Sequence, residues 1–208
     1  MTATLDRTIY GADSPAAAAR AHALLESHDD PYWQAGSAEP WIANLVAALI
    51  RASDPSVAIE VGGFAGYTSR VMAYALATLP HDTSLTVCEI DAQRALSVQE
   101  LLDHLDISPG VRHTVVHDDS LVWIPTLKDR SVDFVWLDGS HEKVHVAREL
   151  ELLWPKMRSR GIIAMHDVFG VCRLSEVLDR FVQDNCNGVA LDLPRLGPAG
   201  GIGIIQAR

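Results

Sequence analysis

The stretch "VAIEVGGFAGYTSR", residues 57–70, decides the fold of this chain. It opens with a short apolar run in which Glu60 is the only charged residue, and such a run is typical of a buried strand. Gly62 and Gly66 follow in a loop that opens a helix, where glycine permits a tight turn and lets a ligand approach the backbone. The stretch therefore predicts the first strand-loop-helix unit of a parallel sheet.

The same alternation of apolar runs and helical stretches continues to the end of the chain. It predicts strands near 57–61, 85–90, 112–116, 132–137, 161–165, 188–192 and 201–206, with helices near 66–78, 92–104, 142–157 and 173–185. We expect a single domain, residues 1–208, with a helical cap over 1–56 and a cofactor-binding core over 57–208. The core is predicted to be a Rossmann-like, doubly wound α/β fold with a seven-stranded, mostly parallel sheet and an antiparallel last strand.

Composition and charge exclude several classes of protein. The 208 residues are 48% hydrophobic and 21% charged, as in an ordinary globular domain. A net charge of −10 argues against nucleic acid or an anionic membrane as a partner and favours a small neutral or cationic ligand. The three cysteines are an odd number without C-x-x-C spacing, so neither a disulfide framework nor a cysteine zinc site is indicated. The first residues lack the basic-then-apolar order of a signal peptide. We therefore expect a cytoplasmic protein.

Four predicted strands end in acids, namely Glu60, Glu89, Asp138 and Asp167. The carboxyl ends of parallel strands lie along one edge of the sheet, where ligands bind. A carboxylate at the end of a buried run needs a cation, a metal ion or several hydrogen-bond donors. Each acid alone could instead cap the following helix, but four together favour a binding site.

The loop after the first strand is unsuited to phosphate, because it contains no lysine and Glu60 would repel a pyrophosphate. An acid in that place suits an ammonium or sulfonium group. Glu89, at the end of the second strand, is placed to accept both hydroxyls of a ribose. A positively charged nucleoside without phosphate matches S-adenosylmethionine.

Residues from about 57 to 168 resemble the class I S-adenosylmethionine-dependent methyltransferases. The narrower resemblance is to small O-methyltransferases of the catechol and caffeoyl-CoA type and of the macrolide-sugar type. It is carried by "EVGGFAGYTS", "CEID", "DDSLVWIPTL" and "DFVWLDGSHEKVHVARELELLWPKMRSRGIIAMHDV". "SAEPWIANLVAALI" is similar to the helix that packs beside the cofactor in that group.

The resemblance implies a set of cofactor contacts. Glu60, Gly62, Phe64 and Gly66 would lie at the methionine end, Glu89 at the ribose, Asp119 and Ser120 at the adenine, and Asp138 at the border with the acceptor. The alternative for Asp119 and Ser120 is a cap for a helix at 121–127. Trp33 and Trp41, in the helical front, are candidates for an aromatic lid over the acceptor.

His141 lies in two overlapping motifs. With His145 it spells H-E-x-x-H, the spacing of two zinc ligands on a helix. The turn "DGS" places His141 at the start of that helix rather than inside it, which argues against a zinc protease. The resemblance instead implies that His141 is the general base, with Asp138 orienting the acceptor, and leaves His145 as a surface or supporting residue. The alternative is a solvated histidine at a helix start.

A divalent cation is the third implied ligand. The resemblance places Mg²⁺ or a softer ion at Asp138 and Asp167, but Val168 stands where the catechol type has asparagine, and His166 stands where the sugar type has glutamate. Three roles are open to His166: it could ligate a softer metal, act as a second base, or hydrogen-bond Asp138.

These inferences predict an S-adenosylmethionine-dependent methyltransferase that acts on a hydroxyl of a small molecule in bacterial secondary metabolism, with metal assistance left open. The alternatives are an NAD-binding Rossmann oxidoreductase, a metal-dependent hydroxylase-like member of the same fold, and a binding module without catalysis. A homodimer is expected by analogy alone.

Overall fold

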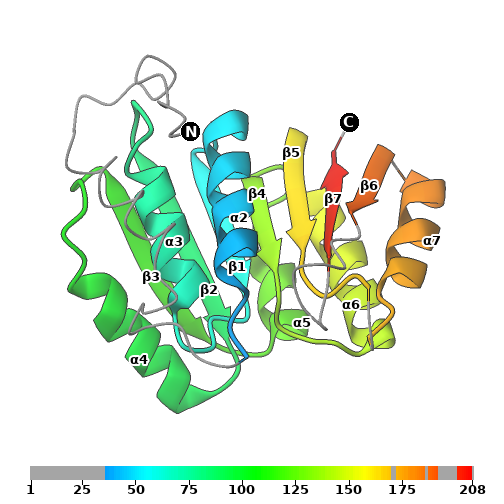
Figure 1. Ribbon diagram of the computed structural model, residues 1–208, viewed down its shortest axis with the longest axis horizontal. Coiled ribbons are helices and arrows are strands. Elements are labelled where there is room, and N and C mark those ends of the chain that lie inside the picture. The colour runs from blue at the N-terminus through cyan, green and yellow to red at the C-terminus, as the bar shows by residue number, and fades with distance from the viewer. Residues whose placement is uncertain (1–35, 170–171, 186, 192–200, 208) are drawn as a thin grey trace, which may run out of the picture.

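The computed structural model describes residues 36–169, 172–185, 187–191 and 201–207. Its strands are β1 (Val57–Val61), β2 (Thr83–Glu89), β3 (Val111–His117), β4 (Val132–Leu137), β5 (Met157–Met165), β6 (Asn187–Leu191) and β7 (Ile202–Gln206). They form one seven-stranded sheet in the order β3-β2-β1-β4-β5-β7-β6 (Figure 1). Pairing is parallel from β3 to β5, whereas β7 runs antiparallel to both β5 and β6. The predicted sheet with an antiparallel last strand is confirmed.

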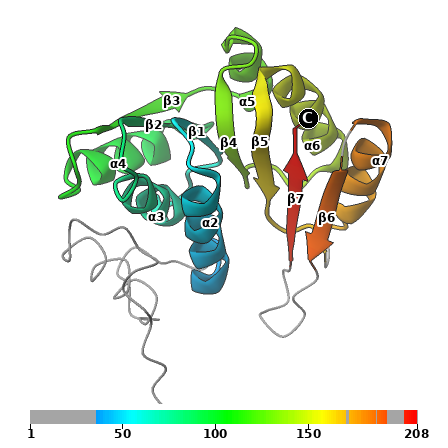
Figure 2. The ribbon, with the colours of Figure 1, turned by 90° about the horizontal axis from the view of Figure 1, so that it is seen from above.

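Helices cover both faces of the sheet, as the view along it shows (Figure 2). One layer holds α2 (Pro40–Ser53), α3 (Tyr67–Leu76) and α4 (Ala92–Asp103). The other holds α5 (Ser120–Trp123), α6 (Lys143–Leu153) and α7 (Ser175–Asn185), with short 3-10 turns at η2 (Ile124–Thr126) and η3 (Trp154–Lys156).

The central strand β4 divides its side chains between the two layers. Phe134 and Trp136 belong to the core beneath α2 and α3, whereas Val135 and Leu137 belong to the core beneath α6 and α7. Successive side chains of a strand point to opposite faces, so a strand buried on both faces is apolar throughout. This is the physical reason why "VDFVWL" is a continuous apolar run after its second residue.

One boundary differs clearly from the prediction. The helix expected over 142–157 ends at Leu153, and β5 begins at Met157 rather than near residue 161. Pro155 has no amide hydrogen to continue the helix, so the chain makes the η3 turn instead. The first half of β5 is exposed at residues 158–160, and its sequence therefore lacks the apolar signal of a buried strand.

The helical front is described only in part. Residues 1–35, including Trp33, lie outside the described residues, whereas the helix expected in "SAEPWIANLVAALIRA" is present as α2. Trp41 lies on α2, where it packs half-buried against the core on that side of the sheet. None of the helices in the described ranges combines the length and the hydrophobicity needed to cross a membrane.

Candidate active site

The rim of the sheet, by which we mean the edge formed by the carboxyl ends of β1 to β5, holds the predicted acids. Backbone hydrogen bonds continue past the strand ends: Gly62 N–H donates to Cys88 O, Asp138 N–H to Val61 O, and His166 N–H to Leu137 O. These bonds, 2.9 to 3.1 Å long, set the residues after β1, β4 and β5 beside one another. Glu60, Glu89, Asp138 and Asp167 are thus brought to one edge.

The glycine loop is shaped by protein contacts. Gly62 has a φ of +91°, and a Cβ there would lie 2.5 Å from Gly139 Cα and 2.6 Å from Asp138 O. Gly66, with a φ of +78°, would place a Cβ 2.5 Å from Leu101 Cδ2. Both positions therefore require glycine before any ligand is considered. Gly62 in particular allows the loops after β1 and β4 to touch.

Phe64 also has a left-handed backbone, with a φ of +45°. Such a conformation is unfavourable for a bulky residue and is concentrated at functional sites. The Arg94 guanidinium lies 4.6 Å from the centre of the Phe64 ring, so a cation–π contact helps to hold the ring. Phe64 is thereby fixed in the loop at the end of β1.

The Glu89 carboxylate is held by the backbone. Its Oε2 accepts a hydrogen bond of 2.8 Å from Phe64 N–H, and its Oε1 accepts one of 2.9 Å from Asp91 N–H. A carboxylate offers about four acceptor positions, so this arrangement orients Glu89 and leaves capacity for two further donors. A pair of vicinal hydroxyls would match that capacity.

Glu60 lies near Glu89, but one of its carboxyl oxygens has no partner. The side chain is 1% exposed, and its Oε2 has no hydrogen-bond partner. Burial raises the pKa of Glu60 well above the ordinary value, and the nearby charges of Asp138 and Glu89 raise it further. A ligand cation placed here would favour the ionised form, because it would return the interactions that burial removes.

Asp119 and Ser120 are less available than predicted. Asp119 Oδ1 accepts from Leu121 N–H at 2.8 Å, which caps α5, as in the alternative interpretation. The Ser120 hydroxyl donates to Glu149 Oε1 at 2.6 Å and lies 3.1 Å from His145 Nε2. These side-chain atoms therefore bond to the protein itself.

His166, the first residue after β5, joins two carboxylates. Its Nδ1 lies 3.2 Å from Asp138 Oδ1 and its Nε2 lies 3.0 Å from Glu39 Oε2. When both carboxylates are ionised they only accept hydrogen bonds, so both ring nitrogens then carry a proton. Burial works against this charge, but the bonds to Asp138 and Glu39 outweigh it and raise the pKa of His166 to about 10.

His141 and Asp167 form a second pair, with 2.8 Å between Nε2 and Oδ2. The hydrogen bond raises the pKa of His141 above its ordinary value, although partial burial opposes the shift. Burial favours the neutral form of Asp167, but the same hydrogen bond prevails and lowers its pKa. His141 keeps 47% of its side chain exposed, so its ring can meet a ligand from solution.

A possible metal centre differs in one residue from the predicted set. Asp138, His141 and Asp167 each offer a ligand atom within 4.8 Å of the others. Asp167 Oδ1 is also buried without a hydrogen-bond partner, which suits an oxygen that ligates a cation. His166 is not part of this group, because both of its nitrogens face carboxylates. Two oxygens and one imidazole nitrogen suit a transition metal as well as Mg²⁺.

The H-E-x-x-H motif does not form a zinc helix. Helix α6 begins at Lys143, so His141 precedes it and only His145 lies within it. His141 Nε2 bonds to Asp167, whereas His145 Nε2 lies 3.2 Å from Glu149 Oε1. The two imidazoles thus serve different partners on different parts of the rim.

Two residues at the rim escaped the sequence analysis. Glu39 is separated from His166 by 127 positions, and its sequence context, before Pro40, indicated only a helix start. Gly139, whose backbone abuts Gly62, was read only as part of a turn. Neither contact has a local sequence signal, since each depends on how distant segments pack.

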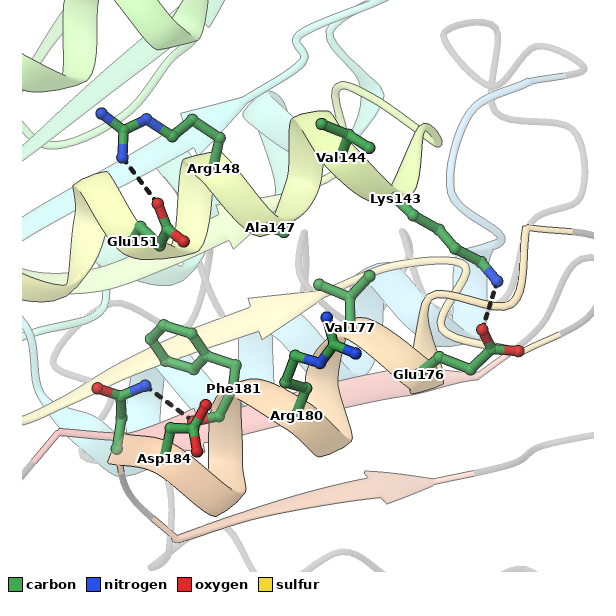
Figure 3. Close-up of a pocket in the computed structure, with 11 residues that line it drawn as sticks. Lys143, Val144, Ala147, Arg148, Glu151, Glu176, Val177, Arg180, Phe181 and Asp184 are labelled. Carbon is green, nitrogen blue, oxygen red and sulfur yellow. Dashed lines mark hydrogen bonds and ion pairs between the residues drawn. The ribbon is translucent and has the colours of Figure 1, made fainter.

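A separate groove of about 530 Å³ lies between α6 and α7 (Figure 3). Val177 and Phe181 contribute apolar surface, and the Lys143–Glu176 ion pair of 2.6 Å closes one end. None of the predicted cofactor or metal residues lines this groove. It is distinct from the acid cluster at the rim.

Residues 59–168 match the model of a family described as a methyltransferase domain. Curated proteins gave no match. Several solved structures share the fold at low identity.

The first is methyltransferase PaMTH1 from Podospora anserina, bound to SAH, with a TM-score of 0.66, 13% identity and 100% coverage of both chains. The second is an O-methyltransferase from Bacillus cereus in complex with SAH, with a TM-score of 0.64, 16% identity and 90% coverage of each chain. The third is the O-methyltransferase TomG from Streptomyces achromogenes, involved in tomaymycin synthesis and bound to SAM, with a TM-score of 0.62, 19% identity and coverage of 93% of this chain and 90% of TomG.

Proposed function

The chain belongs to the methyltransferase domain family, and from that premise we propose that it transfers a methyl group from S-adenosylmethionine to a hydroxyl of a small molecule. One observation carries the proposal. The backbone contact of Gly62 with Gly139 joins a pair of acids, Glu60 and Glu89, to the His141–Asp167 pair at the same rim. The acids suit a cationic nucleoside, and the imidazole suits a proton acceptor.

The cofactor half of the proposal concerns β1 and β2. S-adenosylmethionine supplies an electrophilic methyl group on a sulfonium. Glu60 would receive the ammonium of its methionine part, with Gly62, Phe64 and Gly66 bordering that part, and Glu89 would accept both ribose hydroxyls. Asp119 and Ser120 would border the adenine through their main chain, because their side chains cap α5 and bond to Glu149.

The acceptor half concerns β4 and β5. If His141 Nε2–H donates its hydrogen bond to Asp167, the lone pair of the neutral ring lies on Nδ1. That nitrogen would then take the proton of the acceptor hydroxyl. Asp138, fixed by His166, would orient the acceptor at the border with the cofactor. Proton removal and alignment are the two tasks that methyl transfer leaves to the protein.

A divalent cation is a second proposal for the same residues. Asp138, His141 and Asp167 would hold it, and it would lower the pKa of the acceptor hydroxyl. An imidazole that ligates a metal through Nε2 carries its proton on Nδ1 and cannot also act as the base. Loss of turnover on chelation, restored by Mg²⁺ or Mn²⁺, would favour the metal, whereas full turnover in the chelator would favour the base.

The test has two stages. Isothermal titration should detect binding of S-adenosylmethionine, and no binding at millimolar cofactor would end the proposal. His141→Ala should then retain cofactor binding and lose turnover by about 10²- to 10⁴-fold. His104→Ala, which changes an exposed histidine at the end of α4, is the matched control and should leave turnover unchanged.

Product analysis separates the remaining alternatives. Addition of a methyl group by mass spectrometry supports the proposal, whereas addition of an oxygen atom would favour the hydroxylase-like alternative. Binding of NAD detected by nicotinamide fluorescence would favour an oxidoreductase. Cofactor binding with no turnover on a broad panel of hydroxyl compounds would favour a binding module.

A further inference from the structure

Glu39 occupies an unusual place at the start of α2. Its carbonyl accepts from the N–H groups of Ile42 and Ala43 at 2.9 and 3.0 Å, so its backbone begins the helix. Its side chain makes no capping hydrogen bond. Oε2 instead lies 3.0 Å from His166 Nε2, at the rim. The carboxylate of a helix start is thus directed into the candidate active site.

The His166 ring is held from three sides. Glu39 binds Nε2, Asp138 faces Nδ1 at 3.2 Å, and the Trp136 ring lies 5.7 Å away between centres at an angle of 46°. The contact with Trp136 restricts the plane of the His166 ring, but it does not distinguish the two orientations that a flip of that ring would exchange. Asp138 and, at 3.6 Å, Asp167 Oδ2 face Nδ1, and the bond from Glu39 to Nε2 supports the same orientation from the other side of the ring.

Resting on the proposed function, we propose that Glu39 is a positioning residue for methyl transfer, which holds Asp138 in place through His166. The chain of contacts runs from the start of α2 through His166 to Asp138 and does not include Glu60 or Glu89. Helix α2 packs against α3 and β4, so its place is set by the core. Glu39 therefore ties the acceptor side of the rim to a rigid part of the fold.

The consequence for the reaction follows from geometry. The Asp138 carboxylate has His166 as a hydrogen-bonding partner in the described structure, and under the proposed function it would lie between the cofactor and the acceptor. A misplacement of about 1 Å of an orienting group can lower the rate by about 100-fold. A loss of Glu39 should therefore affect the rate of the bound complex more than the binding of either substrate.

The test compares both ends of one helix. Glu39→Ala should lower kcat by about 10- to 100-fold, as loss of a supporting contact commonly does, and Glu39→Gln should lower it less because its amide oxygen can still accept from Nε2. The cofactor Kd should change by less than about twofold, because the Glu39 carboxylate bonds to His166 and not to the loop between β1 and α3. Asp54→Asn is the matched control, since Asp54 ends α2 and bonds to His81 Nε2 at 3.0 Å far from the rim.

A double-mutant cycle shows whether Glu39 acts through His166. In His166→Asn the amide nitrogen can replace Nδ1 toward Asp138 but cannot reach Glu39. Adding Glu39→Ala to that variant should cause no further loss of kcat, because the two changes break the same chain of contacts. Equal losses in both backgrounds, or an unchanged kcat in Glu39→Ala alone, would overturn the proposal.

Nuclear magnetic resonance of the His166 ring gives a readout that does not depend on turnover. Both ring N–H protons should exchange slowly in the wild type, and the Nε2 proton should exchange rapidly in Glu39→Ala. Unchanged ring protons in that variant would refute the contact. Faster exchange in Glu39→Ala than in the wild type would support the contact. If the wild type also methylates nothing, the proposed function is refuted while the contact stands.

Discussion

The two halves of the rim handle their acids in opposite ways. In the β1–β2 half, Glu89 is held by backbone N–H groups and Glu60 keeps an oxygen without a partner. In the β4–β5 half, Asp138 and Asp167 are each bonded to an imidazole. The first half therefore leaves carboxylate oxygens open to a ligand cation, whereas the second pairs each acid with a histidine and leaves Asp167 Oδ1 buried without a partner.

This difference teaches that acids at strand ends do not share one purpose. Glu60 and Asp138 lie close together in the fold, since Glu60 is near the end of β1 and Asp138 directly follows the neighbouring parallel strand β4. Their partners differ, and the partners determine whether an acid binds charge or aligns a reaction. Four substitutions test this division, beginning with the one expected to act on both halves.

Gly62→Ala should have the largest effect. A left-handed alanine costs about 1 to 2 kcal/mol, and its Cβ would also press on the backbone of Gly139 at 2.5 Å. We expect Tm to fall by about 5 °C or more, and both cofactor binding and turnover to be lost. Gly139→Ala is the milder control, because its Cβ would meet Val61 Cγ1 at 3.2 Å and come no nearer than 3.5 Å to the backbone. Equal Tm values for the two variants would show that the contact between the halves is not tight.

Glu89→Gln should damage the cofactor half alone. One of its two oxygens becomes an NH₂ group, which would face the N–H of Phe64 or Asp91. Because both groups are donors, that hydrogen bond would be lost. Loss of hydrogen bonds to a charged group should raise the cofactor Kd by about 10- to 100-fold. Titration calorimetry measures the change, and kcat at saturating cofactor should stay within about threefold of the wild type. A large drop in kcat with an unchanged Kd would break the division.

Asp138→Asn should give the opposite result. The substitution keeps the shape of the side chain but can set an amide NH₂ against the protonated Nδ1 of His166. We expect kcat to fall by about 10- to 100-fold while the cofactor Kd changes little. Steady-state kinetics combined with calorimetry separates the two quantities. A Kd that rises as far as in Glu89→Gln would assign Asp138 to the cofactor half instead.

Glu149→Gln should have the smallest effect and tests whether every unpartnered oxygen indicates a ligand. Glu149 is fully buried, and its Oε2, like that of Glu60, lacks a partner. Burial raises the pKa of Glu149, so its contribution to stability is present below the ordinary carboxyl pKa and is lost as pH rises through the folded value. Glutamine does not titrate and can still accept from Ser120.

The expected result is therefore a Tm higher than that of the wild type at pH 8 by about 1 to 3 °C, with no gain at pH 4. Thermal unfolding at the two pH values measures it. The cofactor Kd should not change in this variant, whereas Glu60→Gln, the matched change at the rim, should weaken binding. A gain in Tm at pH 4 but not at pH 8 would contradict the assigned direction of the pKa shift.

Much of the fold followed from local patterns. Apolar runs located the strands, and the acids that end them identified the rim, because strand direction alone carries those residues to one edge. The start of β5 was misplaced because its first residues are exposed and polar. Partners were harder to foresee: no local pattern indicated that the Ser120 hydroxyl bonds to Glu149 on α6.

The sequence by itself determined the parallel sheet, the glycine loop and the acids at the rim, since each depends on spacing along a few neighbouring residues. Only the tertiary structure decided that His141 pairs with Asp167, that His166 joins Glu39 to Asp138, and that Gly62 abuts Gly139. These contacts join segments that are far apart in the chain. Their geometry depends on how whole layers pack, and packing leaves no periodic signal in the sequence.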